Sequence, residues 1–299
     1  MGDEAPVETP LAFRCGEALL HGIVSRPPAA VGESSTAVVI VVGGPQYRIG
    51  SHRQFVLLAR ALAARGFPTL RFDCRGMGDS EGRMRTFEGI ESDLRVAVDA
   101  VFGSCPQVRR VVMWGLCDGA SAALMFATSD ARVAGIVAAN PWVRSDSSLA
   151  AARVKHYYGA RLLEREFWSK LARGRFDWRA SISSLTSNLM HALVYRRSRD
   201  ARPADESFQT VMARGLARFR GRVLLVLSGN DLTAQEFVQY TDSAVAWKGL
   251  LSDPKVSRVE LTEADHTFSR RTWLAKVVEE TIEWLKGIDD IGPRGVRAG

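Results

Sequence analysis

The residues Gly115 to Gly119 form a Gly-x-Cys-x-Gly pentapeptide, which an apolar run precedes and a run of small residues follows. This pattern is typical of a nucleophile elbow, a tight strand-to-helix turn with the reactive residue at its tip. Glycine suits the outer positions because a side chain there would crowd the turn. The N-terminus of the following helix favours a thiolate at Cys117. The spacing predicts that Cys117 is a nucleophile, and the alternative is a buried, inert thiol.

Two residues further along the chain complete this prediction. Asp231 follows the apolar run 223–228, and His266 follows the next strand-like run, 257–261. The order of nucleophile, acid and base is that of a Ser-His-Asp type triad in one large class of hydrolytic enzymes. His266 would take the proton of Cys117 and return it to the leaving group, and Asp231 would orient the imidazole. Asp265 is a second candidate for the acid, although its adjacency to His266 does not favour the usual geometry.

Acyl chemistry at Cys117 also needs two backbone donors for the developing oxyanion. The amide of Asp118, directly after the nucleophile, is the first candidate. The second is expected in the loop that follows the first core strand. Pro45 has no amide proton, so we predict Gln46, with Tyr47 as the next choice. The alternative is that this loop is simply a tight turn.

The elements around these residues alternate between strands and helices. Apolar runs predict buried strands, residues 11–25 predict short strands or a hairpin, and helical spacing predicts helices at 55–66, 87–102 and 272–286. The predicted core strands are 37–42, 68–72, 111–116, 133–140, 223–228 and 257–261. Such alternation predicts an α/β fold with a mostly parallel, doubly wound sheet. The candidate residues all follow strand ends, where reactive groups gather on such sheets.

The alternation stops between residues 143 and 220, where helical and polar stretches replace buried strands. We therefore predict a core at 1–142, a helical cap at 143–220 and the rest of the core at 221–299. The cap segment carries 16 basic and 7 acidic residues, whereas the whole chain has a net charge of only +7. A solvated helical surface explains scattered arginines. The functional alternative is that they bind an anionic substrate handle, such as coenzyme A or a carrier protein's phosphopantetheine, together with Tyr47, His52 and Arg53.

The composition limits the remaining classes. The chain has 299 residues, of which 46% are hydrophobic, so it can bury a large core. Its four cysteines have neither metal-site nor disulfide-framework spacing, so we expect no metal and no cofactor. The sequence shows no secretory signal, no membrane span and no nucleic-acid motif, which predicts a cytoplasmic protein acting on a small acyl substrate. The sequence does not indicate an oligomeric state.

Nearly the whole chain resembles the α/β-hydrolase superfamily, and several stretches resemble its exosortase A system-associated hydrolases. Those stretches are residues 41–55, 71–80, 114–118, 227–237 and the segment around His266. The resemblance implies a cytoplasmic hydrolase or acyltransferase with Cys117, Asp231 and His266 as its triad. It implies no substrate, because the group is named for its gene context. Dienelactone hydrolases and polyhydroxyalkanoate synthases share the Gly-x-Cys-x-Gly elbow, but this chain has a large cap and lacks the synthases' length.

Three functions remain open at this point. The first, which we favour, is an acyl hydrolase with a covalent acyl-enzyme, a thioesterase or esterase. The second is an acyltransferase that passes the acyl group from Cys117 to an acceptor other than water. The third is a binding protein on a hydrolase fold, against which the three-residue match argues.

Overall fold

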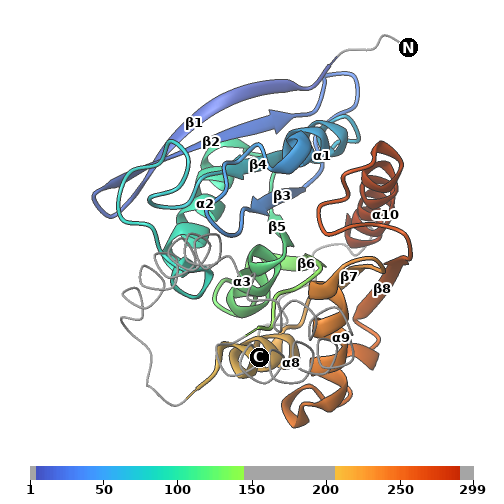
Figure 1. Ribbon diagram of the computed structural model, residues 1–299. Coiled ribbons are helices and arrows are strands. Elements are labelled where there is room, and N and C mark those ends of the chain that lie inside the picture. The colour runs from blue at the N-terminus through green and yellow to red at the C-terminus, as the bar shows by residue number, and fades with distance from the viewer. Residues whose placement is uncertain (1–4, 145–205, 290–299) are drawn as a thin grey trace, which may run out of the picture. The chain divides into compact units, whose positions relative to one another are not determined.

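An eight-stranded sheet organises the described part of the chain, residues 5–144 and 206–289 of a computed structural model (Figure 1). Its strand order is β1-β2-β4-β3-β5-β6-β7-β8. The strands are β1 (Val7–Cys15), β2 (Ala18–Arg26), β3 (Thr36–Val41), β4 (Thr69–Phe72), β5 (Arg110–Leu116), β6 (Val133–Ala139), β7 (Arg222–Ser228) and β8 (Val256–Leu261). From β4 to β8 in this order, all neighbouring strands are parallel, as the sequence predicts. The fold is that of an α/β hydrolase.

The first two strands form an antiparallel hairpin at one edge of the sheet. Val7 pairs with Arg26 and Cys15 pairs with Ala18, and β2 then pairs antiparallel with β4. The hairpin turn begins at Gly16, whose φ of 63° is a conformation that glycine adopts without steric cost. The predicted hairpin is therefore confirmed, with longer strands than the sequence pattern indicated.

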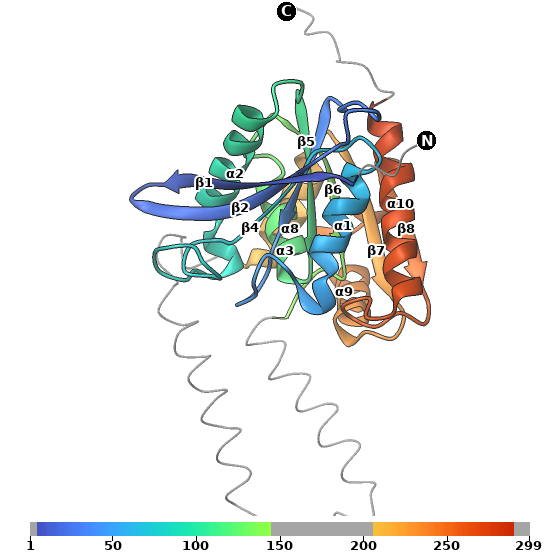
Figure 2. The same ribbon diagram turned by 90° about the horizontal axis from the view of Figure 1, so that it is seen from above.

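Helices cover both faces of the sheet (Figure 2). The helices α1 (Gln54–Ala63) and α10 (Arg271–Asp289) lie on one face. The other face carries α2 (Glu91–Ser104), α3 (Asp118–Phe126) and α8 (Phe208–Arg218), while α9 (Leu232–Ser243) follows β7. Strand β3 is buried along its whole length, which explains its continuous apolar sequence.

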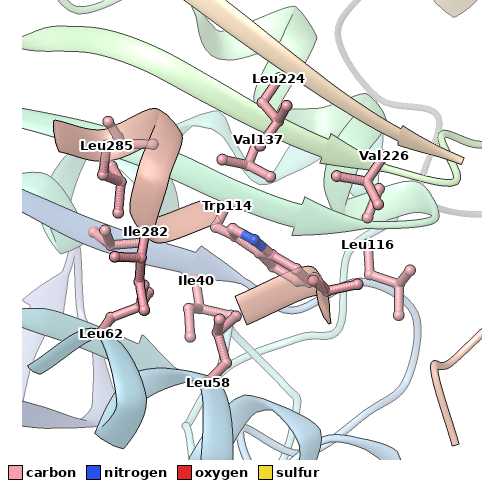
Figure 3. Close-up of a cluster of buried hydrophobic side chains, with 14 of the residues drawn as sticks. Ile40, Leu58, Leu62, Trp114, Leu116, Val137, Leu224, Val226, Ile282 and Leu285 are labelled. Carbon is pink, nitrogen blue, oxygen red and sulfur yellow. The ribbon is translucent and has the colours of Figure 1, made fainter. Parts of the chain in front are cut away.

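The core between the sheet and the helices α1 and α10 surrounds Trp114 of β5 (Figure 3). Its indole is 2% exposed and contacts Phe55 of α1 edge-to-face, with ring centroids 6.0 Å apart. The indole nitrogen donates to Thr281 Oγ1 of α10 at 3.4 Å. Trp114 thus joins both helices to the strand that leads to Cys117. Burial of such a large side chain stabilises the position of that strand by a few kcal/mol.

The chain divides by its contacts into two units, Met1–Trp142 with Ala204–Gly299, and Val143–Pro203. Helix α8, which the sequence analysis assigned to the end of the cap, belongs to the first unit. It packs on α3, and Phe208 contacts Phe87 edge-to-face at 5.1 Å. The core therefore resumes near residue 204 rather than at 221. Most of the predicted cap, residues 145–205, lies outside the described residues.

Candidate active site

Cys117 lies at the tip of the turn between β5 and α3, where the sequence predicts a nucleophile. Its backbone has φ 59° and ψ −124°, a strained conformation for a residue with a side chain. The Cys117 amide donates to Ala139 O of β6 at 2.9 Å, and the Cys117 carbonyl accepts from the Trp142 amide at 3.3 Å. Both backbone polar groups of Cys117 are therefore hydrogen-bonded, to the end of β6 and to the segment that follows it. Cys117 is partly exposed.

The two glycines of the pentapeptide allow this turn because neither tolerates a Cβ. A Cβ on Gly115 would overlap the backbone of Gly119, and a Cβ on Gly119 would overlap Val41 O of β3. The first glycine lets strand and helix approach each other, and the second lets α3 approach β3. Both contacts are close enough that the backbone itself would have to move.

Asp231 and His266, which lie 35 residues apart in the sequence, meet after β7 and β8. His266 Nδ1 is 2.8 Å from Asp231 Oδ2. Asp231 is also the N-cap of α9, and its carboxyl accepts from the amides of Thr233 (3.1 Å) and Ala234 (3.2 Å). Burial alone would raise the pKa of the Asp231 carboxyl, but the hydrogen bond and the charge of His266 outweigh it, and the pKa is lowered. The pair has the arrangement of an acid that orients an imidazole.

The alternative acid, Asp265, makes different contacts. Its carboxyl accepts from the amides of Thr267 (3.2 Å) and Ser269 (2.9 Å) and bonds the Ser269 hydroxyl, so it stabilises the turn after His266. Its pKa is lowered because these bonds and the nearby His52 outweigh burial. His52 and Arg53 are exposed residues with positive φ angles just before α1. His52 therefore lies near the His266 loop, and the role proposed for Arg53 stays a prediction.

The loop after β3 contains Gln46, whose role as the second oxyanion donor stays a prediction. The Gln46 amide donates to Gly44 O at 2.8 Å, which occupies the proton that an oxyanion would need. The Gln46 side-chain oxygen is buried without a partner. Gly44, two residues earlier, lies beside the carboxyl of Asp118, and its amide lowers the pKa of that carboxyl. Both amides therefore have a partner in this structure, and Gly44 is a second candidate donor in this loop beside Gln46.

Tyr47, the other candidate in this loop, is held by an ionic network. Its hydroxyl donates to Asp79 Oδ2 at 2.9 Å, and the Arg48 guanidinium lies 4.4 Å from the centre of its ring. Arg48 also bonds the fully buried Asp73, which accepts the Arg48 amide at 2.6 Å. Asp73 and Asp79 both follow β4. The network therefore fixes the loop after β3 to the loop after β4.

Asn140 is a buried residue at the end of β6 that the sequence analysis did not single out. Its side-chain amide donates to Ser228 Oγ (2.9 Å) and to His266 O (3.1 Å), and its oxygen accepts from the Ser228 amide (2.8 Å). Its φ of 43° is a conformation that asparagine adopts more readily than most residues. Asn140 therefore joins the end of β7 to the backbone of His266. A strand-ending asparagine gives no sequence signal of such non-local bonds.

The remaining cysteines differ from Cys117. Cys15, Cys74 and Cys105 are buried, and burial raises the pKa of each thiol. Among residues 5–144 and 206–289, no cluster of three or more His, Cys, Asp or Glu side chains has a metal-binding arrangement. Within the same ranges, no helix combines the length and apolar character of a membrane-spanning segment.

Comparison with known proteins agrees with this architecture. The model of a family described as "Alpha/beta hydrolase family" matches residues 18–280. The quorum-quenching protein AidA of Acinetobacter baumannii is 33% identical over 154 residues. The match covers 50% of this chain and 48% of AidA, so the chain spans about half the length of this curated relative.

Solved structures share the fold at low identity. The esterase Pf2001 of Pyrococcus furiosus is 16% identical with a TM-score of 0.63, over 94% of this chain and 93% of that one. Est1E of Butyrivibrio proteoclasticus, solved with ferulic acid, is 16% identical with a TM-score of 0.59, over 93% and 98%. A dienelactone hydrolase of Anabaena variabilis is 15% identical with a TM-score of 0.58, over 95% and 99%.

Proposed function

We propose that this chain, which belongs to the alpha/beta hydrolase family, cleaves ester or thioester bonds with Cys117 as its nucleophile. The observation that carries the proposal is the hydrogen bond between Asp231 and His266, at neighbouring strand ends of the sheet whose elbow presents Cys117. A thiol at a helix N-terminus, an imidazole and an orienting carboxylate are the groups that acyl transfer requires.

In the proposed reaction, the Cys117 thiol gives its proton to His266, and the sulfur attacks the acyl carbonyl carbon. The bond to the leaving alcohol or thiol then breaks, and the leaving group takes the proton from His266. Water next gives a proton to His266 and attacks the acyl-cysteine, which releases a carboxylic acid and restores the thiol. Asp231 stabilises the imidazolium in both steps, and the amide of Asp118 with that of Gly44 or Gln46 would receive the oxyanion.

The type of bond cleaved, the acyl acceptor and the subgroup of the family are further parts of the same proposal. A thiolate attacks thioesters readily, so we infer a thioesterase before an oxygen esterase. Passage of the acyl group to another acceptor uses the same residues and is the second candidate. Membership of the exosortase-associated subgroup is inferred from the sequence stretches alone, and it implies a cytoplasmic hydrolase or acyltransferase without indicating the substrate.

Intact-mass spectrometry after exposure to acyl donors tests this proposal. The panel would contain p-nitrophenyl butyrate, butyryl-coenzyme A and, because of the likeness to AidA, quorum-sensing signal molecules. We expect an acyl adduct on Cys117, absent in Cys117→Ala and retained in the matched variant Cys105→Ser, and release of free acid. An adduct that forms only on other residues would contradict the nucleophile. An adduct that leaves only when an amine or alcohol acceptor is added would favour the acyltransferase.

The basic segment 143–220 motivates a narrower proposal about the substrate. Most of this segment lies outside the described residues, so its excess of basic residues is a sequence observation. If these residues bind a phosphate-bearing handle, the KM for butyryl-coenzyme A should rise steeply with salt, whereas the KM for p-nitrophenyl butyrate should barely change. An equal salt response for both donors would contradict this role.

A further inference from the structure

The side chain of Asp118 has a position that neither the triad nor the oxyanion donors explain. Its carboxyl packs against the loop after β3. A Cβ on Gly43 would overlap Asp118 Oδ1 and the Gly119 amide, and a Cβ on Gly44 would lie 3.6 Å from Asp118 Oδ2. Gly43 therefore leaves the space that the carboxyl fills, and Gly44 lies in ordinary contact with it.

Three backbone amides interact electrostatically with this carboxyl and lower its pKa. They are the amides of Gly44, Gly119 and Asp118 itself. The first and the last are candidate donors for an acyl oxyanion. The protein thus places an anionic group of its own beside donors that the reaction could use.

The carboxyl is also close to other ionisable groups. Cys117 precedes it in the chain. His266, from the loop after β8, and Cys74, after β4, both interact with it electrostatically. Burial raises the pKa of Asp118 to about 6, although the three amides and His266 lower it. At neutral pH the group is therefore mostly a carboxylate, in a place where its charge is poorly solvated.

We propose that the Asp118 carboxylate is a positioning residue that fixes the Gly43–Gly44 loop and opposes negative charge on Cys117 and on the acyl oxygen until a substrate engages the Gly44 amide. This inference rests on the proposed role of Cys117 as the nucleophile. A like charge beside a thiol disfavours the thiolate, so the carboxylate restrains the resting site. A substrate whose carbonyl oxygen takes the Gly44 proton would compete directly with the carboxylate.

The pH dependence of Cys117 alkylation tests the inference without any substrate. Iodoacetamide labelling would be followed by peptide mass spectrometry between pH 5 and 9 in wild type, Asp118→Asn and Asp265→Asn. We expect Asp118→Asn to lower the midpoint of the alkylation profile by about one pH unit, because the like charge is gone. Asp265→Asn, which removes a carboxylate that bonds Thr267 and Ser269, should leave the midpoint unchanged.

An unchanged or higher midpoint in Asp118→Asn would overturn the inference, because a purely structural role alters the rate at every pH without moving the midpoint. Circular dichroism checks that the variant folds, and Asp118→Ser replaces it if it does not. Wild-type protein with 13C-labelled aspartate carboxyls gives a second measurement. One carboxyl resonance should titrate near pH 6, and its absence would likewise overturn the inference.

The outcome also separates this inference from the proposed function. If Cys117 reacts no faster than the buried Cys15, Cys74 and Cys105, the nucleophile assignment fails. If Cys117 reacts rapidly with the same midpoint in wild type and Asp118→Asn, the assignment stands and the role of Asp118 fails.

Discussion

The N-termini of α9 and α3 each place an aspartate carboxyl against backbone amides, but the two carboxyls differ in acidity. Asp231 caps α9 and bonds the amides of Thr233 and Ala234. Asp118 is the first residue of α3, and its own amide and that of Gly119 act on its carboxyl. The pKa of Asp231 is lowered, whereas the pKa of Asp118 is raised to about 6.

The difference follows from the weight of burial at each site and from the imidazole, and not from the helix. Burial raises the pKa of both groups, and backbone amides lower it at both sites. His266 hydrogen-bonds Asp231, but it acts on Asp118 through charge alone. A helix N-terminus therefore does not by itself determine whether a buried carboxyl is a strong or a weak acid; burial and a direct hydrogen-bonding partner do.

The largest effect is expected from removing that partner. His266→Ala deletes the proposed base and leaves the buried Asp231 without its imidazole. We expect ester turnover to fall by about 10⁴-fold or more. Alkylation of Cys117 at pH 7 should slow as well. Stopped assays with p-nitrophenyl butyrate and peptide mapping measure both. Turnover close to wild type would show that His266 is not the base.

Changing the acid tests which carboxyl orients His266. Asp231→Asn keeps the cap of α9 but presents an amide to the imidazole, which favours the wrong tautomer. We expect kcat to fall by about 10³- to 10⁴-fold with the fold retained. Asp265→Asn is the matched control and should stay within about twofold of wild type, because its carboxyl bonds Ser269 instead. The reverse ranking of the two variants would exchange their roles.

A smaller effect is expected when the backbone of His266 loses its support. Asn140→Gly removes three side-chain hydrogen bonds, while glycine adopts the positive φ without strain. The variant therefore tests the loss of the hydrogen bonds alone. We expect kcat to fall about tenfold with little change in KM, as for a base that is less well positioned. Asn140→Ala adds the strain and should be less stable than Asn140→Gly at equal activity. Wild-type kcat in the glycine variant would mean that these bonds serve folding alone.

The smallest effect concerns stability, and its sign is opposite for the two carboxyls. The raised pKa of Asp118 means that its contribution to folded-state stability falls as pH rises from about 4 to above 6. Asp118→Asn should therefore raise the free energy of unfolding relative to wild type at pH 8 more than at pH 4.5, by at most on the order of 3 kcal/mol. Because the pKa of Asp231 is lowered, its carboxylate stabilises the folded state at neutral pH and loses that contribution in acid. Asp231→Asn should therefore destabilise the folded state more at pH 7 than at pH 3. Thermal unfolding across this range measures both, and parallel pH curves would remove the contrast.

The local parts of this site could be predicted from the sequence. The elbow depends on residues within one pentapeptide, and Gly115 and Gly119 are required by backbone contacts that any such turn makes. Asp231 and His266 could be placed because parallel strands end at the same edge of the sheet. The doubly wound sheet followed from the alternation of elements.

The remaining parts depend on contacts between distant segments. The pattern of Phe208–Arg218 suits any amphipathic helix, and its contacts with α3 and Phe87 assign it to the core. The same limit applies to Asn140, whose partners lie 88 and 126 residues away. The sequence favoured Gln46 because Pro45 has no amide proton, whereas the turn that uses the Gln46 amide is not visible in the residue types.

The end of β6 has a consequence for how the site keeps its dimensions. Ala139 bonds the amide of Cys117, and its neighbour Asn140 bonds the backbone of His266. Nucleophile and base are thus both held at the end of β6, by its last residue and by the residue that follows it. Motion of β6 relative to its neighbours displaces Cys117 and His266 together. The distance between these two residues should therefore vary less than distances between residues that are held by different strands. A one-residue slip in the pairing of β6, by contrast, would misplace both at once.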